Sequence, residues 1–213
     1  GKTTIFNLIS RIYNATKGKI VFDGREITNL SPHQIANLGI ARTFQNIELF
    51  ENATVLDNLL LGRHPHRGRQ SIFGEIFFLP GIRKRELEHR LSVEQIIDFL
   101  DLAHYRNIYI SVLPYGVRKV VELGRALASE PKLLLLDEPS SGLNVEETED
   151  MSFWIKDIRD EFGTTVCMVE HDMTLVNSVS DEVLALNYGR VIAQGTPREV
   201  QNHSEVIKAY LGD

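Results

Sequence analysis

Apolar residues along the chain recur in two patterns, which predict buried strands and amphipathic helices in alternation. Residues 133–136 are four consecutive leucines between Pro131 and a turn of small residues. Such a short apolar run is typical of a strand that is buried on both faces. Similar but shorter patterns predict further strands at residues 18–23, 40–44, 164–169, 183–186 and 191–193.

Apolar residues at helical spacing predict helices between these strands. Ser31 followed by Pro32 is typical of a helix start, as is Asp172, and Gly39 is typical of a helix end. The predicted helices cover the residues after Thr4, residues 31–39, 52–61, 82–100, 120–128 and 146–162, the residues after Asp172, and two short segments at the end of the chain.

The alternation of strands and helices predicts an α/β fold with a mostly parallel sheet and right-handed crossovers. The stretch from residue 46 to about residue 128 is mainly helical in pattern. We therefore expect a single domain over residues 1–213. Its core would be residues 1–45 and 129–213, and a helical subdomain would be inserted at about residues 46–128.

Two adjacent carboxylates, Asp137 and Glu138, follow the leucine run. Ligands of open α/β sheets bind at the carboxyl ends of the strands, so this pair lies at the expected binding edge. Neighbouring strand residues point to opposite sides, so one carboxylate can serve a metal ion while the other acts on a water molecule. A strand that simply ends in a solvated polar turn can carry the same pair. The pair alone therefore does not decide between a binding site and an ordinary turn.

The first residues, Gly1, Lys2, Thr3 and Thr4, are the closing part of a phosphate-binding loop. In that loop the glycine lets the backbone approach phosphate, the lysine reaches the β- and γ-phosphates, and the hydroxyl binds Mg²⁺. The predicted helix that follows presents its N-terminus, which favours anions. Together with LLLLDE, the segment predicts a P-loop nucleotidase. We expect the strand and the first glycine of the loop to precede Gly1 in a longer chain.

Two other polar residues follow predicted strands and so belong to the same sheet edge. Gln45 comes after residues 40–44, and His171 comes shortly after residues 164–169. An isolated histidine at such a place is more often a capping or core group, and an isolated glutamine is more often a surface amide. For His171, the position beside Glu138 on a neighbouring strand favours a role at the site instead. For Gln45, only the order of the motifs along the chain favours such a role.

Composition narrows the classes of function. Hydrophobic residues make up 43% and charged residues 24% of the chain, as in an ordinary globular protein. The net charge of -6 argues against a general nucleic-acid binder, although residues 63–69 and 83–85 contain basic clusters. The single cysteine, Cys167, suits a reducing compartment, and its apolar neighbours predict burial. No apolar run approaches the roughly 20 residues of a transmembrane helix, so a membrane role would be peripheral.

The order of the motifs GKTT, Gln45, LPYGVRK, LLLLDEP, SSGLN and EHD resembles the nucleotide-binding subunit of ABC transporters. The resemblance covers essentially the whole chain and implies the P-loop NTPase fold of an ABC ATPase. The segments RTFQNIELFENATVLDNLLLG and EVIKAYLGD are most similar to the ATPases of branched-chain amino acid importers. Related urea and amide importers would look much the same.

The resemblance implies a role for each motif. Glu138 matches the catalytic base, His171 the switch histidine at the γ-phosphate, and Gln45 the glutamine that touches metal and water. Asp137 matches the Walker B aspartate, so the implied metal ligands are Thr3, Gln45 and Asp137. The implied contacts with ATP and its metal come from Gly1, Lys2, Thr3, Thr4, Gln45, Asp137 and His171, and from the signature motif Leu113, Pro114, Tyr115, Gly116 and Val117.

In this family the signature motif contacts ATP that is held by the other protomer, and residues 141–144 match the D-loop beside it. Pro114 and Tyr115 depart from the usual L-S-G-G-Q signature, and proline has neither hydroxyl nor N–H to offer a phosphate. Asn144 stands where the D-loop usually has aspartate. The residue that stacks on adenine in the family would precede Gly1, so we expect the chain as given to bind ATP weakly.

The function implied by the resemblance is Mg²⁺-dependent ATP hydrolysis coupled to transmembrane import of branched-chain amino acids or a related small polar solute. The implied partners are a second copy or a sister ATPase subunit, two transmembrane permease subunits and, indirectly, a solute-binding protein. The implied location is the cytoplasmic face of the inner membrane, as a peripheral subunit, with no nucleic-acid partner.

Two other classes of function stay open. A soluble ABC ATPase that acts on ribosomes or DNA would carry tandem cassettes, a basic linker or a coiled-coil insertion, whereas this chain shows one cassette and a net charge of -6. A non-hydrolysing regulatory module would have a decayed site. Glu138 and His171 argue against that module, and Pro114 favours it.

Overall fold

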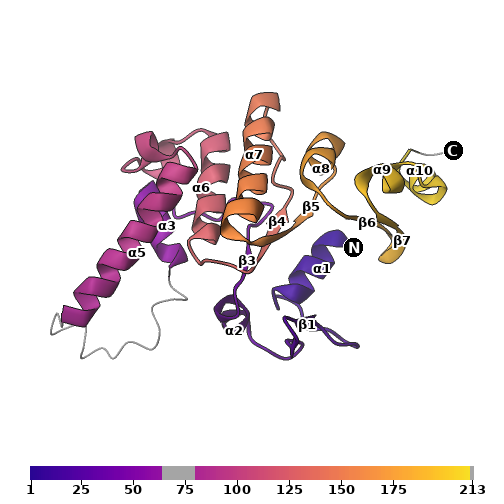
Figure 1. Ribbon diagram of the computed structural model, residues 1–213, viewed down its shortest axis with the longest axis horizontal. Helices are drawn as coiled ribbons and strands as arrows, with labels where there is room; N and C mark the ends of the chain where they lie inside the picture. The colour runs from indigo at the N-terminus through magenta and orange to yellow at the C-terminus, as the bar shows by residue number, and fades with distance from the viewer. Residues whose placement is uncertain (64–79, 212–213) are drawn as a thin grey trace.

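A three-stranded parallel sheet lies at the centre of the computed structural model, which describes residues 1–63 and 80–211 (Figure 1). Its strands are β3 (Ile40–Arg42), β4 (Leu133–Asp137) and β5 (Thr165–Val169), in the order β3-β4-β5. Ile40 pairs with Leu133, and Leu133 pairs in turn with Thr165. The leucine run is therefore the middle strand of a parallel sheet, as the sequence predicts.

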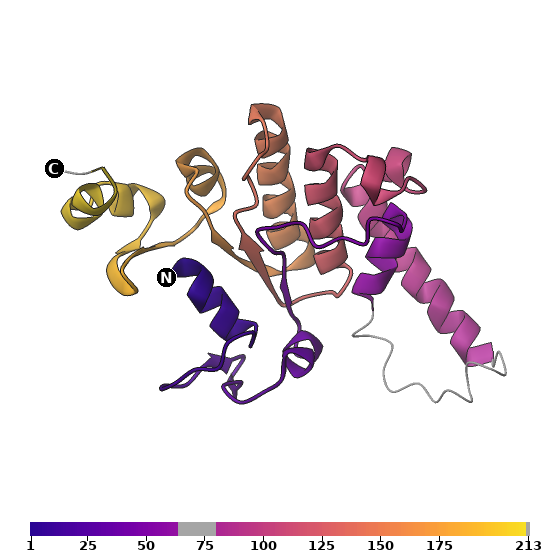
Figure 2. The ribbon, with the colours of Figure 1, turned by 180° about the vertical axis from the view of Figure 1, so that it is seen from behind.

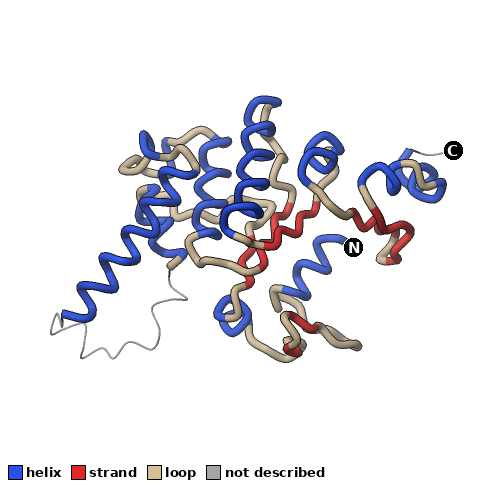
Figure 3. The backbone as a smooth tube through the Cα atoms, viewed as in Figure 1, coloured by secondary structure: helices blue, strands red, loops and turns tan. Residues whose placement is uncertain are grey.

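The side chains of β4 alternate between two hydrophobic clusters, one on each face of the sheet. Leu134 and Leu136 belong to the larger cluster, with α3, α5, α6, α7 and α8. Leu135 belongs to the smaller cluster, which includes Phe6 of α1 and Val169 of β5. Helices lie on both sides of the red central strands in Figure 3. Burial on both faces explains why this strand is an uninterrupted apolar run.

The N-terminal part of the chain forms one side of the molecule. Helix α1 covers Lys2–Ile9, and the strands β1 (Val21–Phe22) and β2 (Arg25–Glu26) form a short hairpin. Asp23 and Gly24 have φ values of 50° and 74°, the left-handed backbone that a two-residue hairpin turn requires. Helix α2 (Pro32–Asn37) starts at Ser31, whose hydroxyl accepts a hydrogen bond from the Gln34 N–H.

The helical part is built from α3 (Val55–Gly62), α5 (Pro80–Phe99) and α6 (Tyr115–Leu127). Thr54 caps α3, because its hydroxyl accepts a hydrogen bond from the Asp57 N–H. Proline at Pro80 begins α5 instead of interrupting a helix, because a first helical residue needs no N–H partner. Residues 64–79, which include most of the basic cluster predicted at residues 63–69, fall outside the described residues. Two 3-10 turns, η2 (Ala103–Tyr105) and η3 (Ile110–Val112), lie between α5 and α6.

The last part of the chain continues with α7 (Val145–Phe162), β5 and α8 (Met173–Val179). Helix α7 is capped at Asn144 and ends at Gly163, whose φ of 63° is the left-handed conformation typical of a helix C-terminus. The strands β6 (Val183–Asn187) and β7 (Arg190–Gly195) then form an antiparallel hairpin, followed by α9 (Pro197–Gln201) and α10 (Ser204–Leu211).

The two views of the ribbon agree on the arrangement of these parts. Helices α6, α7 and α8 stand on one side of the central sheet, whereas α1 and α2 lie on the other side (Figure 2). The hairpin β6–β7 with α9 and α10 lies at one end of the molecule, and α5 lies at the other end. No helix in the described part of the chain is long and apolar enough to cross a membrane.

The predicted burial of Cys167 is wrong, because this residue is exposed. Within the described residues β5 pairs only with β4, so its other edge carries no strand. A groove of about 590 Å³ follows that edge and is lined by Cys167, by Phe6 and by residues from 179 to 184. An apolar neighbourhood in the sequence therefore did not guarantee a packed neighbour in space.

Replacing a leucine of β4 should lower stability in proportion to the cavity that it leaves. Leu134 is fully buried in the larger cluster, so Leu134→Ala should reduce the free energy of unfolding by about 2 to 5 kcal/mol. Leu91→Ala is a matched control, because Leu91 is 56% exposed on α5, and its effect should be about 0.5 kcal/mol or less. Urea denaturation of both variants measures the difference, and equal losses would contradict this account of the core.

Candidate functional site

Three predicted site residues meet at the carboxyl ends of the central strands. The Gln45 side-chain amide donates a hydrogen bond to Glu138 Oε2 at 3.0 Å. His171 Nδ1 lies 4.0 Å from Glu138 Oε1. The carboxylate of Glu138 therefore lies between an amide that follows β3 and an imidazole that follows β5. This meeting confirms only that the three residues lie close together; their roles stay a prediction.

The backbone at Glu138 is held in an unusual conformation. Its φ is 52°, in the left-handed region that residues other than glycine rarely adopt. The Glu138 N–H donates to the Val169 carbonyl at 2.9 Å, and the Glu138 carbonyl accepts from Lys119 Nζ at 2.8 Å. Strained backbone of this kind persists where its surroundings fix it, and it clusters at functional sites. The strain turns the chain sharply just after β4.

Lys119 reaches this carbonyl from α6 and is itself buried. Burial lowers the pKa of its ammonium group, and the nearby carboxylates of Glu122, Glu170, Glu138 and Asp137 oppose that shift more weakly. A buried ammonium needs partners of this kind to remain in the fold. Lys119 thus ties α6, which carries the signature motif at its start, to the turn that presents Glu138.

Asp137 is buried, and one of its two carboxylate oxygens is paired. Its Oδ2 lies 2.8 Å from Arg42 Nη2, whereas its Oδ1 is buried without a hydrogen-bond partner. A buried carboxylate oxygen without a donor is costly unless a ligand uses it, and carboxylate oxygens are the ligands that Mg²⁺ prefers. Of the predicted metal ligands, Asp137 therefore has the clearest feature that suits a cation. The described residues contain no cluster of three or more His, Cys, Asp or Glu that could hold a metal by themselves.

Glu170 begins the EHD motif, but the sequence analysis gave it no role of its own; in the structure it joins two loops of the site. Its Oε1 accepts from the N–H and hydroxyl of Ser140, and its Oε2 accepts from the N–H groups of His171 and Asp172. The side chain is only 1% exposed. The predicted phosphate-binding Lys2 donates from Nζ to the Glu170 carbonyl at 3.4 Å. The position of Glu170 beside His171 was the one available sequence signal.

The GKTT segment forms the start of α1, as predicted. Gly1 is the residue before the helix and makes no side-chain cap, so the first N–H groups of α1 remain for a ligand. Thr3 and Thr4 are exposed. A side chain at Gly1 would lie 3.2 Å from the Gly189 Cα, which shows that the segment lies close to the turn between β6 and β7. The helix N-terminus and Lys2 are both suited to bind an anion.

The signature residues lie apart from the Glu138 group and pack on residues that follow β4. A side chain at Gly142 would lie 2.7 Å from the Tyr115 ring, and one at Gly116 would lie 2.1 Å from Glu147 Oε1. Pro114 stands before α6 and makes no side-chain cap. In the part of the chain that the structure describes, no hydrogen bond or ion pair joins residues 113–117 to Gln45, Glu138 or His171.

Glu122 is a second contact between α6 and the loop that carries Gln45. The Phe44 N–H donates to Glu122 Oε1 at 3.2 Å, and Arg125 of the same helix donates to the Glu48 carbonyl. Burial raises the pKa of Glu122, and the Phe44 hydrogen bond and the charge of Arg125 oppose this shift. Lys119 and Glu122 are three positions apart and therefore share a face of α6, which a helical reading of charged residues could have found.

The groove of about 590 Å³ does not coincide with this chemistry. It follows the open edge of β5 and includes Lys2 and Glu170, but neither Asp137 nor Glu138 lines it. The groove reflects an uncovered strand edge, whereas the polar side chains converge on Glu138. We therefore place the candidate site at the carboxyl ends of β3, β4 and β5.

A family model described as "ABC transporter" matches residues 1–141. The chain belongs to the ABC transporter ATP-binding family. A second model, described as "Branched-chain amino acid ATP-binding cassette transporter", matches residues 190–213 of this ABC cassette. These matches confirm the resemblance that the motif order predicts.

Relatives support the same assignment along the whole ABC cassette. The "High-affinity branched-chain amino acid transport ATP-binding protein BraF" of Pseudomonas aeruginosa is 39% identical over all of this chain and 83% of its own length. The protein LivG of Escherichia coli, described in the same words, is 35% identical with the same coverage. The sulfate/thiosulfate import protein CysA of Neisseria meningitidis is 32% identical over all of this chain and 56% of its own length.

Solved structures show that the fold is that of an ABC ATPase. An ATP-binding cassette of an ABC transporter in its ADP conformation matches with a TM-score of 0.83 and 30% identity, over 100% of this chain and 84% of the other. A nucleotide-free ATP-binding cassette matches with a TM-score of 0.79 and 29% identity over the same shares. The predicted fold class is therefore confirmed.

The buried carboxyl of Glu122 gives the stability of this ABC cassette a definite dependence on pH. Because the folded chain binds this proton more tightly than the unfolded chain, the contribution of Glu122 falls as pH rises from 4.5 through its raised pKa. Glu122→Gln keeps an oxygen acceptor for Phe44 and removes this titration. The variant should therefore gain stability relative to the wild type as pH rises from about 4.5 to about 8. Urea denaturation across that range checks the sign, and a constant or falling difference would contradict it.

Proposed function

We propose that this chain is the ATP-binding and ATP-hydrolysing subunit of an importer for branched-chain amino acids. The observation that carries the proposal is the position of the Glu138 carboxylate between Gln45 and His171, at the sheet edge where Lys2 also lies. The described function of the 39% identical relative and the match over residues 190–213 support the choice of solute class.

We assign phosphate binding to the start of α1. Lys2 supplies a positive charge, and the free N–H groups of the first turn, from Gly1 to Thr4, add oriented donors. Phosphoryl transfer depends mainly on positioning and on stabilising charge, so these fixed donors lower the barrier without taking part in bond formation.

We assign the role of base to Glu138, which orients and polarises the attacking water. The Gln45 amide and the His171 imidazole flank its carboxylate on the two neighbouring loops. His171 is 66% exposed and can turn toward the γ-phosphate when nucleotide is bound. The strained backbone at Glu138 and the Lys119 contact fix where the carboxylate emerges, which is the positioning that this reaction needs.

Thr3, Gln45 and Asp137 would hold Mg²⁺, and the unpartnered Asp137 Oδ1 suits such a cation. When bound, the metal ion neutralises charge on the β- and γ-phosphates. The chain's own part is to supply these oxygen atoms and to hold the Asp137 carboxylate in place beside Arg42.

We assign the signature residues 113–117 and the D-loop residues 141–144 to a second nucleotide, which a copy of this chain or a sister subunit holds. The packing of Tyr115 on Gly142 keeps the two motifs together, which supports a shared surface. The assembly would include two transmembrane permease subunits and, indirectly, a solute-binding protein. It would place this chain at the cytoplasmic face of the membrane as a peripheral subunit, and the helical subdomain at about 46–128 would face the permease.

Glu138→Gln should abolish hydrolysis while sparing ATP binding. Loss of a positioned base lowers the rate by roughly 100-fold to 10,000-fold. Steady-state Mg²⁺-ATPase rates and an equilibrium ATP titration measure the two properties separately. The variant should also accumulate an ATP-stabilised dimer, which size-exclusion chromatography with light scattering detects.

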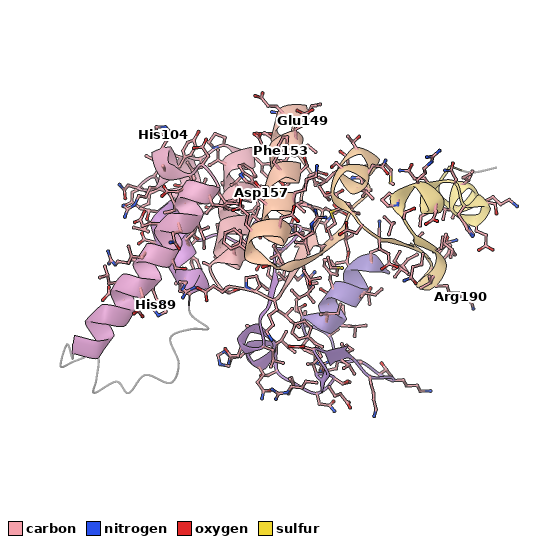
Figure 4. The ribbon with its side chains drawn as sticks, in the orientation of Figure 1. His89, His104, Glu149, Phe153, Asp157 and Arg190 are labelled. Atoms are coloured by element: carbon pink, nitrogen blue, oxygen red, sulfur yellow. The ribbon has the colours of Figure 1, made fainter. Side chains whose placement is uncertain are left out.

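Glu149→Gln is the matched control, because Glu149 lies on the exposed face of α7, on the same helix as Phe153 and Asp157 (Figure 4). Its hydrolysis rate should equal that of the wild type. A Glu138→Gln variant that hydrolyses ATP at the wild-type rate would remove Glu138 from the mechanism. Absence of hydrolysis in the wild type, despite tight ATP binding, would favour a non-hydrolysing module or a required partner subunit.

The solute class is tested by transport. In cells that lack the gene for this chain, uptake of radiolabelled leucine, isoleucine and valine should fall, and the wild-type gene should restore it. The Glu138→Gln gene should not. Unchanged uptake of all three amino acids, together with intact ATPase activity, would assign another solute to the importer.

A further inference from the structure

Arg42 is the last residue of β3 and the first residue of the segment RTFQNIELFENATVLDNLLLG, and it carries a buried charge to which the resemblance assigns no role. Its side chain is 6% exposed. Nη2 lies 2.8 Å from Asp137 Oδ2, and Nη1 donates to Asn7 Oδ1 at 2.7 Å and to Ser10 Oγ at 3.0 Å. The guanidinium also lies over the Phe44 ring, with 5.1 Å between its central carbon and the ring centroid.

A buried ion pair is expensive to desolvate and by itself is weak evidence of a gain in stability. Its geometry is nevertheless specific, because the planar guanidinium satisfies three acceptors in fixed directions and also stacks on an aromatic ring. These contacts join residues that are far apart in the sequence: Arg42 and Asp137 are separated by 95 positions, and Arg42 and Asn7 by 35. The pair therefore fixes the relative positions of α1, β3 and β4.

The two oxygens of Asp137 are treated differently by this arrangement. Arg42 takes Oδ2, and Oδ1 remains buried without a donor. A carboxylate that ligates a metal is typically held in place by a hydrogen bond from a residue that is not itself a ligand. Loss of that hydrogen bond lowers the affinity of the site for the metal. Arg42 meets this description, since it fixes one oxygen and leaves the other for a cation.

We propose that Arg42 is a positioning residue for the metal carboxylate, which ties Asp137 to the phosphate-binding helix α1 through Asn7 and Ser10. This inference rests on the proposed function, because it assumes that Asp137 serves the Mg²⁺ of an ATPase. In this arrangement one guanidinium holds the metal site and the phosphate-binding helix together.

Charge neutralisation alone would give a different result from positioning. A lysine at residue 42 keeps the positive charge, but its single ammonium cannot bond Asp137, Asn7 and Ser10 together or stack on Phe44 as a plane. If Arg42 only neutralises Asp137, the lysine variant behaves as the wild type. If Arg42 competes with the cation for Asp137, its removal tightens metal binding.

The experiment is a titration of the protein with Mn²⁺ in the presence of ADP, followed by electron paramagnetic resonance of the free ion. Arg42→Lys should raise the Mn²⁺ dissociation constant by about 10-fold to 100-fold. In EDTA, where no metal ion is bound, the ADP dissociation constant of Arg42→Lys should differ from that of the wild type by about twofold or less. The reason is that Lys2 and the N-terminus of α1, which bind the phosphates, are unchanged. The ATPase rate of Arg42→Lys, which is reduced by the weaker metal binding, should recover partly at high Mg²⁺.

Arg106→Lys is the matched control, since Arg106 forms a two-pronged ion pair with Glu94 and joins residues outside the site. It should leave Mn²⁺ binding unchanged. Asn7→Ala is the second variant: it keeps the charge pair and removes one tether, and it should raise the Mn²⁺ dissociation constant by about tenfold or less. If Arg42→Lys does not fold, Mn²⁺ binding by Asn7→Ala tests whether Arg42 positions Asp137 for the metal.

Unchanged or tighter Mn²⁺ binding in a folded Arg42→Lys or Asn7→Ala protein would overturn the inference. An equal loss of metal-free ADP binding would also overturn it, because the effect would then be general and not directed at the metal. A wild-type protein without Mg²⁺-dependent hydrolysis would instead count against the proposed function. The two failures are therefore distinguishable.

Discussion

The pairing of β4 with a parallel strand on each edge is the constraint on which the site depends. Parallel pairing to β3 and β5 brings three carboxyl ends to one edge of the sheet. Burial of both faces fixes the register, because a slip by one residue would move each leucine to the wrong cluster. Gln45, Glu138 and His171 are neighbours for this reason, although they follow three separate strands.

Helix α6 contacts the loops at the carboxyl ends of the central strands. Lys119 contacts the Glu138 carbonyl, and Glu122 accepts from the Phe44 N–H just before Gln45. Both are buried ionisable side chains, which proteins keep only where they have partners. The helix that begins at the signature motif is therefore mechanically linked to the turn of Glu138 and to the loop of Gln45. A movement of α6 would therefore displace both the turn of Glu138 and the loop of Gln45.

Two buried acids of the site, Glu170 and Asp137, differ in how fully their oxygen atoms are hydrogen-bonded. Glu170 gathers four donors from the residues that follow β4 and β5, and so holds the D-loop side and the histidine side together. Asp137 is only half satisfied, with one oxygen on Arg42 and the other without a donor. A fully bonded carboxylate is suited to structure, whereas a half-bonded one retains capacity for a ligand.

The sequence by itself determined the local structure and the motif order. The leucine run, the caps at Ser31 and Asp172 and the two adjacent carboxylates act over a few residues, so their effects could be predicted from spacing. The order of the motifs was also enough to predict the ABC ATPase fold. The boundary of α5 at Pro80 shows the usual limit, since proline both breaks and begins helices.

Tertiary structure decided which groups meet and which are covered. The pairing of Arg42 with Asp137, and the contact of Glu170 with Ser140, depend on strands and loops that are 95 and 30 positions apart. Local patterns carry no information about such partners. The exposure of Cys167 has the same cause, because burial of a strand residue depends on what lies beside the strand and not on its own neighbours in the chain.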